Sequence, residues 1–176
     1  MSDHPNAVPV VSVVGAADSG KTTFLEKLIR ELSGRGVRVA TVKHYHHDYD
    51  TDVAGKDSWR HAQAGSMVAM VSSPSKLSVV ERVQREATLA ELAVIAFNAG
   101  SDVLLTEGYK REGVNRVEIS RREAGSKLLT SADQLLALVT DMPEEAPAGV
   151  AVFDLDDAAG VADLVQSRFL APRGGD

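Results

Sequence analysis

Short apolar runs rich in β-branched residues recur along the chain and alternate with segments of helical periodicity. The runs expected to form strands are residues 8–14, 37–42, 67–71, 102–106, 135–140 and 150–153. Strands that are apolar at nearly every position are covered on both faces, as in a parallel sheet flanked by helices. Two further runs, 78–83 and 116–119, fit this pattern less well, and we expect them to be extra antiparallel strands at a sheet edge.

Three helices of this alternation are predicted from spacing and capping residues. They cover residues 22–33, 89–97 and a last segment that ends at position 169. Thr88 and Glu91 form a capping-box pattern ahead of the second helix, and Asp156 or Asp157 is expected to cap the last one. The alternation of strands and helices predicts a single α/β domain with a core over about residues 8–170 and a loose tail.

Composition narrows the function classes. The 176 residues carry a formal net charge of −6, which argues against a surface that binds nucleic acid. The chain has no cysteine, so disulfides, thiolate metal sites and cysteine nucleophiles are excluded. No apolar run approaches the roughly 18 residues that a membrane span needs. We therefore expect a cytoplasmic protein that acts on a small molecule or on another protein.

The segment between the first predicted strand and the first helix carries the most specific motif. It runs Gly15, Ala16, Ala17, Asp18, Ser19, Gly20, Lys21, Thr22 and matches the P-loop (Walker A) pattern G-x-x-x-x-G-K-[ST] in full. The glycines let the backbone turn its N–H groups toward phosphate oxygens, and the helix N-terminus adds further donors. Lys21 supplies a positive charge for the β- and γ-phosphates, and the Thr22 hydroxyl can ligate Mg²⁺. The motif predicts binding of a nucleoside triphosphate.

A P-loop site also needs a hydrophobic strand that ends in an acid. The segment DVLLTEG, residues 102–108, places Glu107 at the carboxyl end of such a strand, where open α/β sheets collect their ligands. Asp102 would begin the strand at the opposite end. Glu107 is therefore the candidate for holding Mg²⁺ or positioning the attacking water, and the alternative is a surface glutamate beside a turn glycine.

The segment after the second strand is dense in possible ligands. His44, His46 and His47 fall close to three aspartates, of which Asp48 and Asp50 are the first two. His with Asp suits Zn²⁺ or Ni²⁺. The interpretation we favour is a polar loop at the mouth of the nucleotide site that contributes Asp48 or Asp50 to Mg²⁺ through water.

A short helix is expected to follow this loop. Asp57 or Ser58 is its predicted cap, and Lys56 and Arg60 are candidates for facing phosphate or a second substrate. For both basic side chains, a solvated surface position is at least as good an interpretation.

Four segments in this order resemble the molybdopterin-guanine dinucleotide biosynthesis protein B (MobB) family. They are GAADSGKTT, TVKHYHHDYDTDVAGKDSWRHAQAG, DVLLTEGYK and LVTDMP. The resemblance implies a three-layer P-loop GTPase fold, GTP binding with weak hydrolysis, and a homodimer. It further implies cooperation with a MobA-type guanylyltransferase, which attaches GMP to molybdopterin, with molybdopterin or a molybdoenzyme-maturation complex as further candidate partners.

The same resemblance assigns roles by position. Residues 15–23, Thr23 included, bind the phosphates, and Glu107 is the strand-end acid. The loop that begins at Lys43 and runs to Asp50, with residues 56–60, faces the γ-phosphate or the partner's pterin.

The base-reading residue has to be inferred separately, because the N-K-x-D element of regulatory GTPases is absent. One carboxylate held in plane can accept both donors on the Watson–Crick edge of guanine. Asp141 follows the strand 135–140 in the place where P-loop GTPases read the base, and Asp154 is the weaker candidate. The alternative is that Asp141 only opens the turn through Met142 and Pro143.

Two other functions remain open on the sequence. One is a small-molecule kinase, although nothing resembles a lid of clustered arginines, and the pair Arg121-Arg122 is interpreted as a solvated turn. The other is a nickel or zinc metallochaperone GTPase that uses the three histidines. For the expected homodimer, the two antiparallel edge strands at 78–83 and 116–119 are the predicted interface.

Overall fold

The computed structural model describes residues 6–45, 47, 53–125 and 127–170. These residues fall into two compact units, one formed by the described parts of 1–44 and 88–176 and the other by those of Tyr45–Ala87. The first unit contains the main sheet and the P-loop segment. The single-domain assignment stays a prediction.

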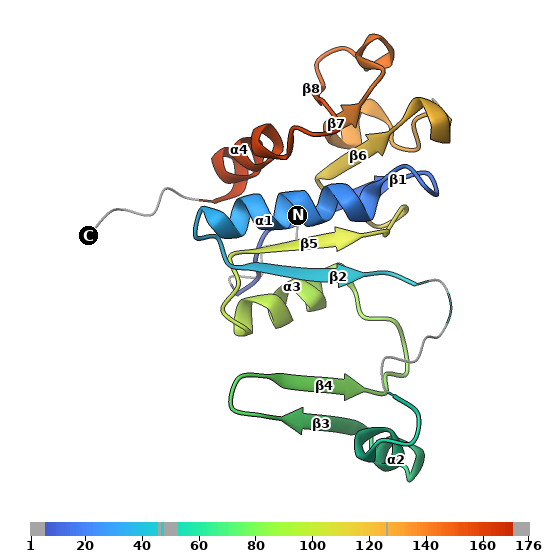
Figure 1. Cartoon of the computed structure of the whole chain (residues 1–176), viewed down its shortest axis with the longest axis vertical. Helices are drawn as coiled ribbons and strands as arrows, with labels where there is room; N and C mark the ends of the chain where they lie inside the picture. The colour runs from blue at the N-terminus through green and yellow to red at the C-terminus, as the bar shows by residue number, and fades with distance from the viewer. Residues whose placement is uncertain (1–5, 46, 48–52, 126, 171–176) are drawn as a thin grey trace, which may run out of the picture. The chain divides into compact units, whose positions relative to one another are not determined.

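A six-stranded parallel sheet forms the centre of the first unit, in the order β2-β5-β1-β6-β7-β8. Its strands are β1 (Val10–Gly15), β2 (Val39–Lys43), β5 (Val103–Glu107), β6 (Arg116–Ser120), β7 (Leu135–Thr140) and β8 (Ala151–Phe153). Figure 1 shows β2, β5 and β1 running in the same direction, so their carboxyl ends meet at one edge. The predicted α/β fold with a mostly parallel sheet is confirmed.

Helices cover both faces of this sheet, as expected. On one face, α1 (Lys21–Gly34) and α4 (Ala158–Phe169) pack on a core that includes Leu105 of β5. On the other face, α3 (Leu89–Asn98) packs on a smaller core that includes Leu104. Successive β5 residues thus point into different cores, which explains why the strand is apolar throughout. In the described part of the chain, no helix combines the length and apolarity that a membrane crossing requires.

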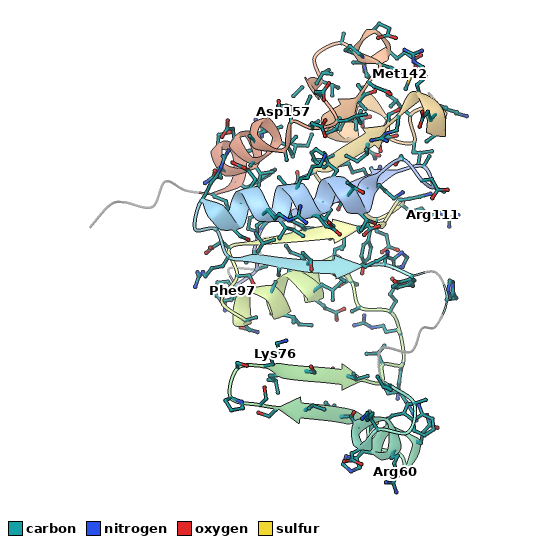
Figure 2. The ribbon with its side chains drawn as sticks, viewed as in Figure 1. Arg60, Lys76, Phe97, Arg111, Met142 and Asp157 are labelled. Carbon is teal, nitrogen blue, oxygen red and sulfur yellow. The ribbon has the colours of Figure 1, made fainter. Side chains whose placement is uncertain are left out.

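The helix boundaries follow the capping residues. Thr88 accepts a hydrogen bond from the N–H of Glu91, and the Glu91 side chain accepts one from the Thr88 N–H, so the predicted capping box is confirmed. Asp157 caps α4 by accepting from the N–H of Gly160 at 2.8 Å; Figure 2 labels Asp157 at the start of this helix. Of the two aspartates proposed for this role, Asp157 is therefore the cap.

The prediction of an antiparallel edge strand at 116–119 is wrong. β6 is parallel and lies between β1 and β7, so both of its edges are paired. Its two charged residues, Arg116 and Glu118, are both buried. The Glu118 carboxylate accepts the N–H groups of Leu129 and Thr130 at 2.7 and 2.9 Å. Backbone partners outside the strand make a central position possible for these charged residues.

The second unit contains a short helix and a hairpin. They are α2 (Asp57–Gln63), β3 (Val68–Ser72) and β4 (Leu77–Glu81). The run 67–71 was expected to join the parallel sheet, but β3 pairs antiparallel with β4 in a separate two-stranded sheet. The antiparallel strand expected at 78–83 is confirmed as β4. The cap of α2 is Lys56, without a side-chain hydrogen bond, so neither Asp57 nor Ser58 is the cap.

Candidate functional site

The loop that joins β1 to α1 has a backbone that only particular residues permit. Gly15 has a φ of +150°, and a Cβ there would lie 2.4 Å from the Ile119 carbonyl oxygen and 2.7 Å from Ser19 Oγ. Asp18 and Gly20 also have positive φ, at +57° and +91°. The loop is therefore a tight curl seated against the end of β6, and a side chain at Gly15 would displace it.

This curl and the helix that follows offer hydrogen-bond donors to a ligand. Gly20 is the N-cap of α1 and makes no side-chain capping hydrogen bond, so the N–H groups of the first helical turn are not capped. The Ser19 hydroxyl oxygen is buried and has no hydrogen-bond partner within the described residues. Uncapped N–H groups, a helix dipole and an unpartnered buried hydroxyl together form a cradle that fits a phosphate group.

Lys21 is the first residue of α1, and its ammonium folds back over the loop to donate to the Ala16 carbonyl oxygen. Burial lowers the pKa of Lys21 below its usual value, the positive charge of Lys110 lowers it further, and Glu107 opposes both effects. An anion bound in the loop would favour the charged form of this ammonium. The Lys21 ammonium therefore lies over the P-loop, and its contact with phosphate stays a prediction.

Thr22 and the strand-end acid are brought together. Thr22 Oγ1 donates to Glu107 Oε1 at 2.7 Å, although the two residues are 85 positions apart. Lys43, at the end of β2, places its Nζ 3.6 Å from the same carboxylate oxygen. Glu107 is only 9% exposed, so it is not a surface glutamate. A hydroxyl and a buried carboxylate at this distance match the donor set that Mg²⁺ takes beside a bound triphosphate.

The loop after β5 makes close contacts with His44 and Arg116. Gly108 has a φ of +100°, and a Cβ there would lie 3.2 Å from the His44 Cβ. Tyr109 is buried and stacks on the His44 ring with the ring centroids 4.5 Å apart. Arg116 donates to the carbonyls of Gly113 and Arg111 at 2.8 and 2.9 Å; Arg111 is labelled in Figure 2. These contacts position the backbone that directly follows Glu107.

The two candidates for reading the base are exposed carboxylates at the carboxyl ends of β7 and β8. Asp141 Oδ1 accepts the Arg122 N–H at 2.9 Å. The turn after Asp141 is opened by Thr140 instead, whose Oγ1 accepts the Met142 N–H at 3.0 Å. Asp154 accepts the N–H of Asp156 within its own turn. The turn-opening alternative for Asp141 is therefore not what the geometry shows.

The proposed metal ligands of the loop after β2 fall outside the described residues in part. His46, Asp48 and Asp50 are not described, so the Asp48 contribution to Mg²⁺ and the three-histidine metal site stay predictions. Among the residues that are described, no group of three His, Asp or Glu side chains could hold a metal ion.

One residue of the site was missed by sequence reasoning. Arg121 and Arg122 were interpreted together as a solvated turn, and Arg122 is indeed exposed and pairs with Glu144 at 2.9 Å. The Arg121 side chain instead points toward the P-loop, with its Nη2 3.6 Å from where a Gly20 Cβ would lie. The sequence shows that Arg121 directly follows a predicted strand. That position would have indicated the P-loop only if this strand, β6, had been placed beside β1.

Comparisons with known proteins show the family of this chain. Residues 10–141 match the family model described as molybdopterin guanine dinucleotide synthesis protein B, MobB. Molybdopterin-guanine dinucleotide biosynthesis adapter proteins of Haemophilus influenzae and Escherichia coli are 32% and 33% identical. These matches cover 92% and 90% of this chain, and 90% and 91% of the relatives. The crystal structure of Bacillus subtilis MobB superposes with a TM-score of 0.72 at 32% identity, covering 92% of this chain and 98% of that one. The chain belongs to the MobB family.

Proposed function

We propose that this protein binds GTP with Mg²⁺ at the P-loop and acts as an adapter in the synthesis of molybdopterin guanine dinucleotide. The observation that carries the proposal is the 2.7 Å hydrogen bond between Thr22 and Glu107 beside the P-loop curl. It joins the two halves of a nucleotide site that are separate in the sequence. Family membership and the names of the relatives support the pathway.

Different residues bind the phosphates and the Mg²⁺ ion. The backbone of residues 15–20 and the N–H groups at the start of α1, Thr23 included, bind the phosphates, and Lys21 neutralises the β- and γ-phosphates. Thr22 and Glu107 would hold Mg²⁺, which supplies charge for the developing negative phosphate oxygens. The Lys43 ammonium lies beside the Glu107 carboxylate, and in this proposal it faces the γ-phosphate. Lys21 and Glu107 are the catalytic residues of a slow GTPase.

Guanine selection is assigned to Asp141. Its Oδ1 already accepts one backbone N–H, which fixes the orientation of the carboxylate. Each carboxylate oxygen has two lone pairs, so the group can still accept from N1–H and the 2-amino group of guanine. The N1 of adenine is an acceptor and would be repelled by the same carboxylate.

The proposed partner is a MobA-type guanylyltransferase in the cytoplasm, and the proposed assembly is a homodimer. β6 is paired on both edges and cannot contribute to the dimer interface as first expected. β4 remains a candidate, because the hairpin has an exposed apolar face. On this face Met70 is 64%, Leu77 65% and Val79 53% exposed. A second copy of the hairpin would cover such a surface.

The proposed function is tested by measuring how fast a MobA-type guanylyltransferase converts molybdopterin to its guanine dinucleotide with and without this protein. Wild type with GTP is expected to raise the rate. Lys21→Ala is expected to lose this effect because the triphosphate is no longer held, while Lys76→Ala, an exposed lysine in the β3–β4 turn, retains it. An identical rate with and without the wild-type protein would contradict the adapter role.

A further inference from the structure

We propose that Arg121 binds the phosphate chain of the nucleotide from the β6 side of the P-loop. This inference rests on the proposed function, because it assigns one more contact to the same ligand. It goes beyond the P-loop motif, since Arg121 lies 100 positions later in the chain.

The topology places Arg121 beside the P-loop. β6 runs parallel to β1, and their register pairs Gly15 with Ile119, so the last residue of β1 and the end of β6 lie next to each other. The tight approach of Gly15 to the Ile119 carbonyl fixes this arrangement. Arg121 follows Ser120, the last residue of β6, and therefore leaves the sheet at the edge where the phosphate cradle begins.

The guanidinium group points into the space above the last glycine of the loop. Apart from Gly20 and its own neighbours in the chain, the described atoms nearest to a Cβ built on Gly20 are Nη2 and Cζ of Arg121, at 3.6 and 3.8 Å. Gly20 is also the uncapped N-cap of α1, so the guanidinium stands beside the N–H groups that are available to an anion. The guanidinium of Arg121 and the N–H groups at the start of α1 are thus two independent sets of donors beside Gly20.

Within the part of the chain that the structure describes, the Arg121 guanidinium forms no ion pair. Its Nε is buried and has no hydrogen-bond partner within the described residues. The positive charge of Arg121 contributes to the lowered pKa of Asp156, but the main cause is Lys27, with which the Asp156 carboxylate pairs at 2.5 Å. A buried donor without an acceptor is costly in a folded protein, and a phosphate oxygen would relieve this cost.

The neighbouring residue provides a matched comparison. Arg122 has the same side chain one position later, but it is exposed and donates to Glu144 at the surface. Its backbone N–H is the one held by Asp141. Of these two neighbours, Arg121 is the one whose guanidinium group has both the direction and the unpartnered donor that a phosphate contact needs.

The test compares Arg121→Ala, Arg121→Lys and Arg122→Ala by titration with GTP and, separately, with inorganic triphosphate, both with Mg²⁺. Arg121→Ala should weaken both ligands by the same factor, roughly 10- to 100-fold, because the lost contact is to phosphate. Arg121→Lys should recover part of the loss, since it restores the charge without the fork, and Arg122→Ala should bind as wild type. The urea midpoint of ligand-free Arg121→Ala should not fall, because the removed guanidinium has an unpartnered Nε.

Each other outcome contradicts the assignment in a recognisable way. Wild-type affinity of Arg121→Ala for GTP would refute the contact and leave the proposed function standing. A loss for GTP alone, with inorganic triphosphate unaffected, would mean that Arg121 touches the base or ribose. Weaker binding accompanied by a lowered midpoint, with no recovery in Arg121→Lys, would mean that the residue is structural. Failure of the wild-type protein itself to bind GTP would overturn the proposed function first.

Discussion

Replacing Glu107 by glutamine keeps the shape of the side chain and removes its charge. In the free protein the carboxylate accepts a hydrogen bond from the Thr22 hydroxyl at 2.7 Å and lies 3.6 Å from the Lys43 ammonium. A hydrogen bond to a charged group contributes about 1.5–3 kcal/mol, and a neutral one about 0.5–1.5 kcal/mol. The Lys43 side chain is 49% exposed, so its ion pair contributes about 1 kcal/mol at most. Glu107→Gln should therefore cost only about 1–2 kcal/mol of unfolding free energy.

Glu107→Gln should change the Mg²⁺ dependence of GTP binding more than it changes stability. The ratio of GTP affinity with Mg²⁺ to that in excess chelator should fall at least roughly tenfold, because a neutral amide is a poor ligand for this hard cation. The rate of phosphate release in a single turnover should fall further, since the carboxylate acts as charge develops. Affinity in chelator should stay within about threefold of wild type. Thr22→Val is the paired variant, because it removes the hydroxyl from the same donor set.

The reasoning fails in two distinguishable ways. An unchanged Mg²⁺ dependence together with an unchanged rate would mean that Glu107 does not serve the metal. A loss of stability well above about 3 kcal/mol with the Mg²⁺ dependence intact would make Glu107 a structural residue, since it exceeds what these two contacts can supply.

Three further predictions address the ammonium, the base and the assembly. The lowered pKa of Lys21 means that GTP affinity, which needs the charged form, should be full below this pKa and should fall as pH rises through it. Lys110→Ala removes one cause of the lowering and should move the fall to higher pH, whereas no movement would contradict this cause. Asp141→Asn should weaken GTP roughly 30- to 150-fold and XTP less, and an unchanged rank order of GTP, XTP and ATP would exclude Asp141 as the base reader. Val79→Glu should turn the dimer into a monomer in sedimentation, and a wild-type protein that is already monomeric at micromolar concentration would refute the hairpin interface.

Sequence reasoning succeeded where the determining contacts are local. The P-loop pattern needs only consecutive residues, and the capping box at Thr88 spans four positions, so both were readable and the capping box is confirmed. Glu107 could also be proposed as a site residue, because an acid at the end of an apolar strand has a defined place in a parallel sheet, and its role stays a prediction. The 2.7 Å contact with Thr22 fits this assignment.

Sequence reasoning failed where a residue's environment depends on distant segments. The central position of β6 is possible because Glu118 is satisfied by the N–H groups of Leu129 and Thr130, which no pattern within 116–119 reveals. β3 was misplaced since an apolar run does not say which strand it will pair with. Arg121 was missed because its proposed role depends on β6 lying beside β1, and the sequence had placed β6 at an edge.

The central claim is that the P-loop curl and Glu107 form a GTP site, and one titration tests it most directly. Fluorescent GTP and ATP analogues are titrated into wild type and Lys21→Ala, with Mg²⁺ and with chelator, and circular dichroism checks the fold of both proteins. We predict that wild type prefers GTP to ATP and binds more tightly with Mg²⁺, and that Lys21→Ala keeps its fold but loses at least about 100-fold in affinity. Equal GTP affinity in the two folded proteins would contradict the account.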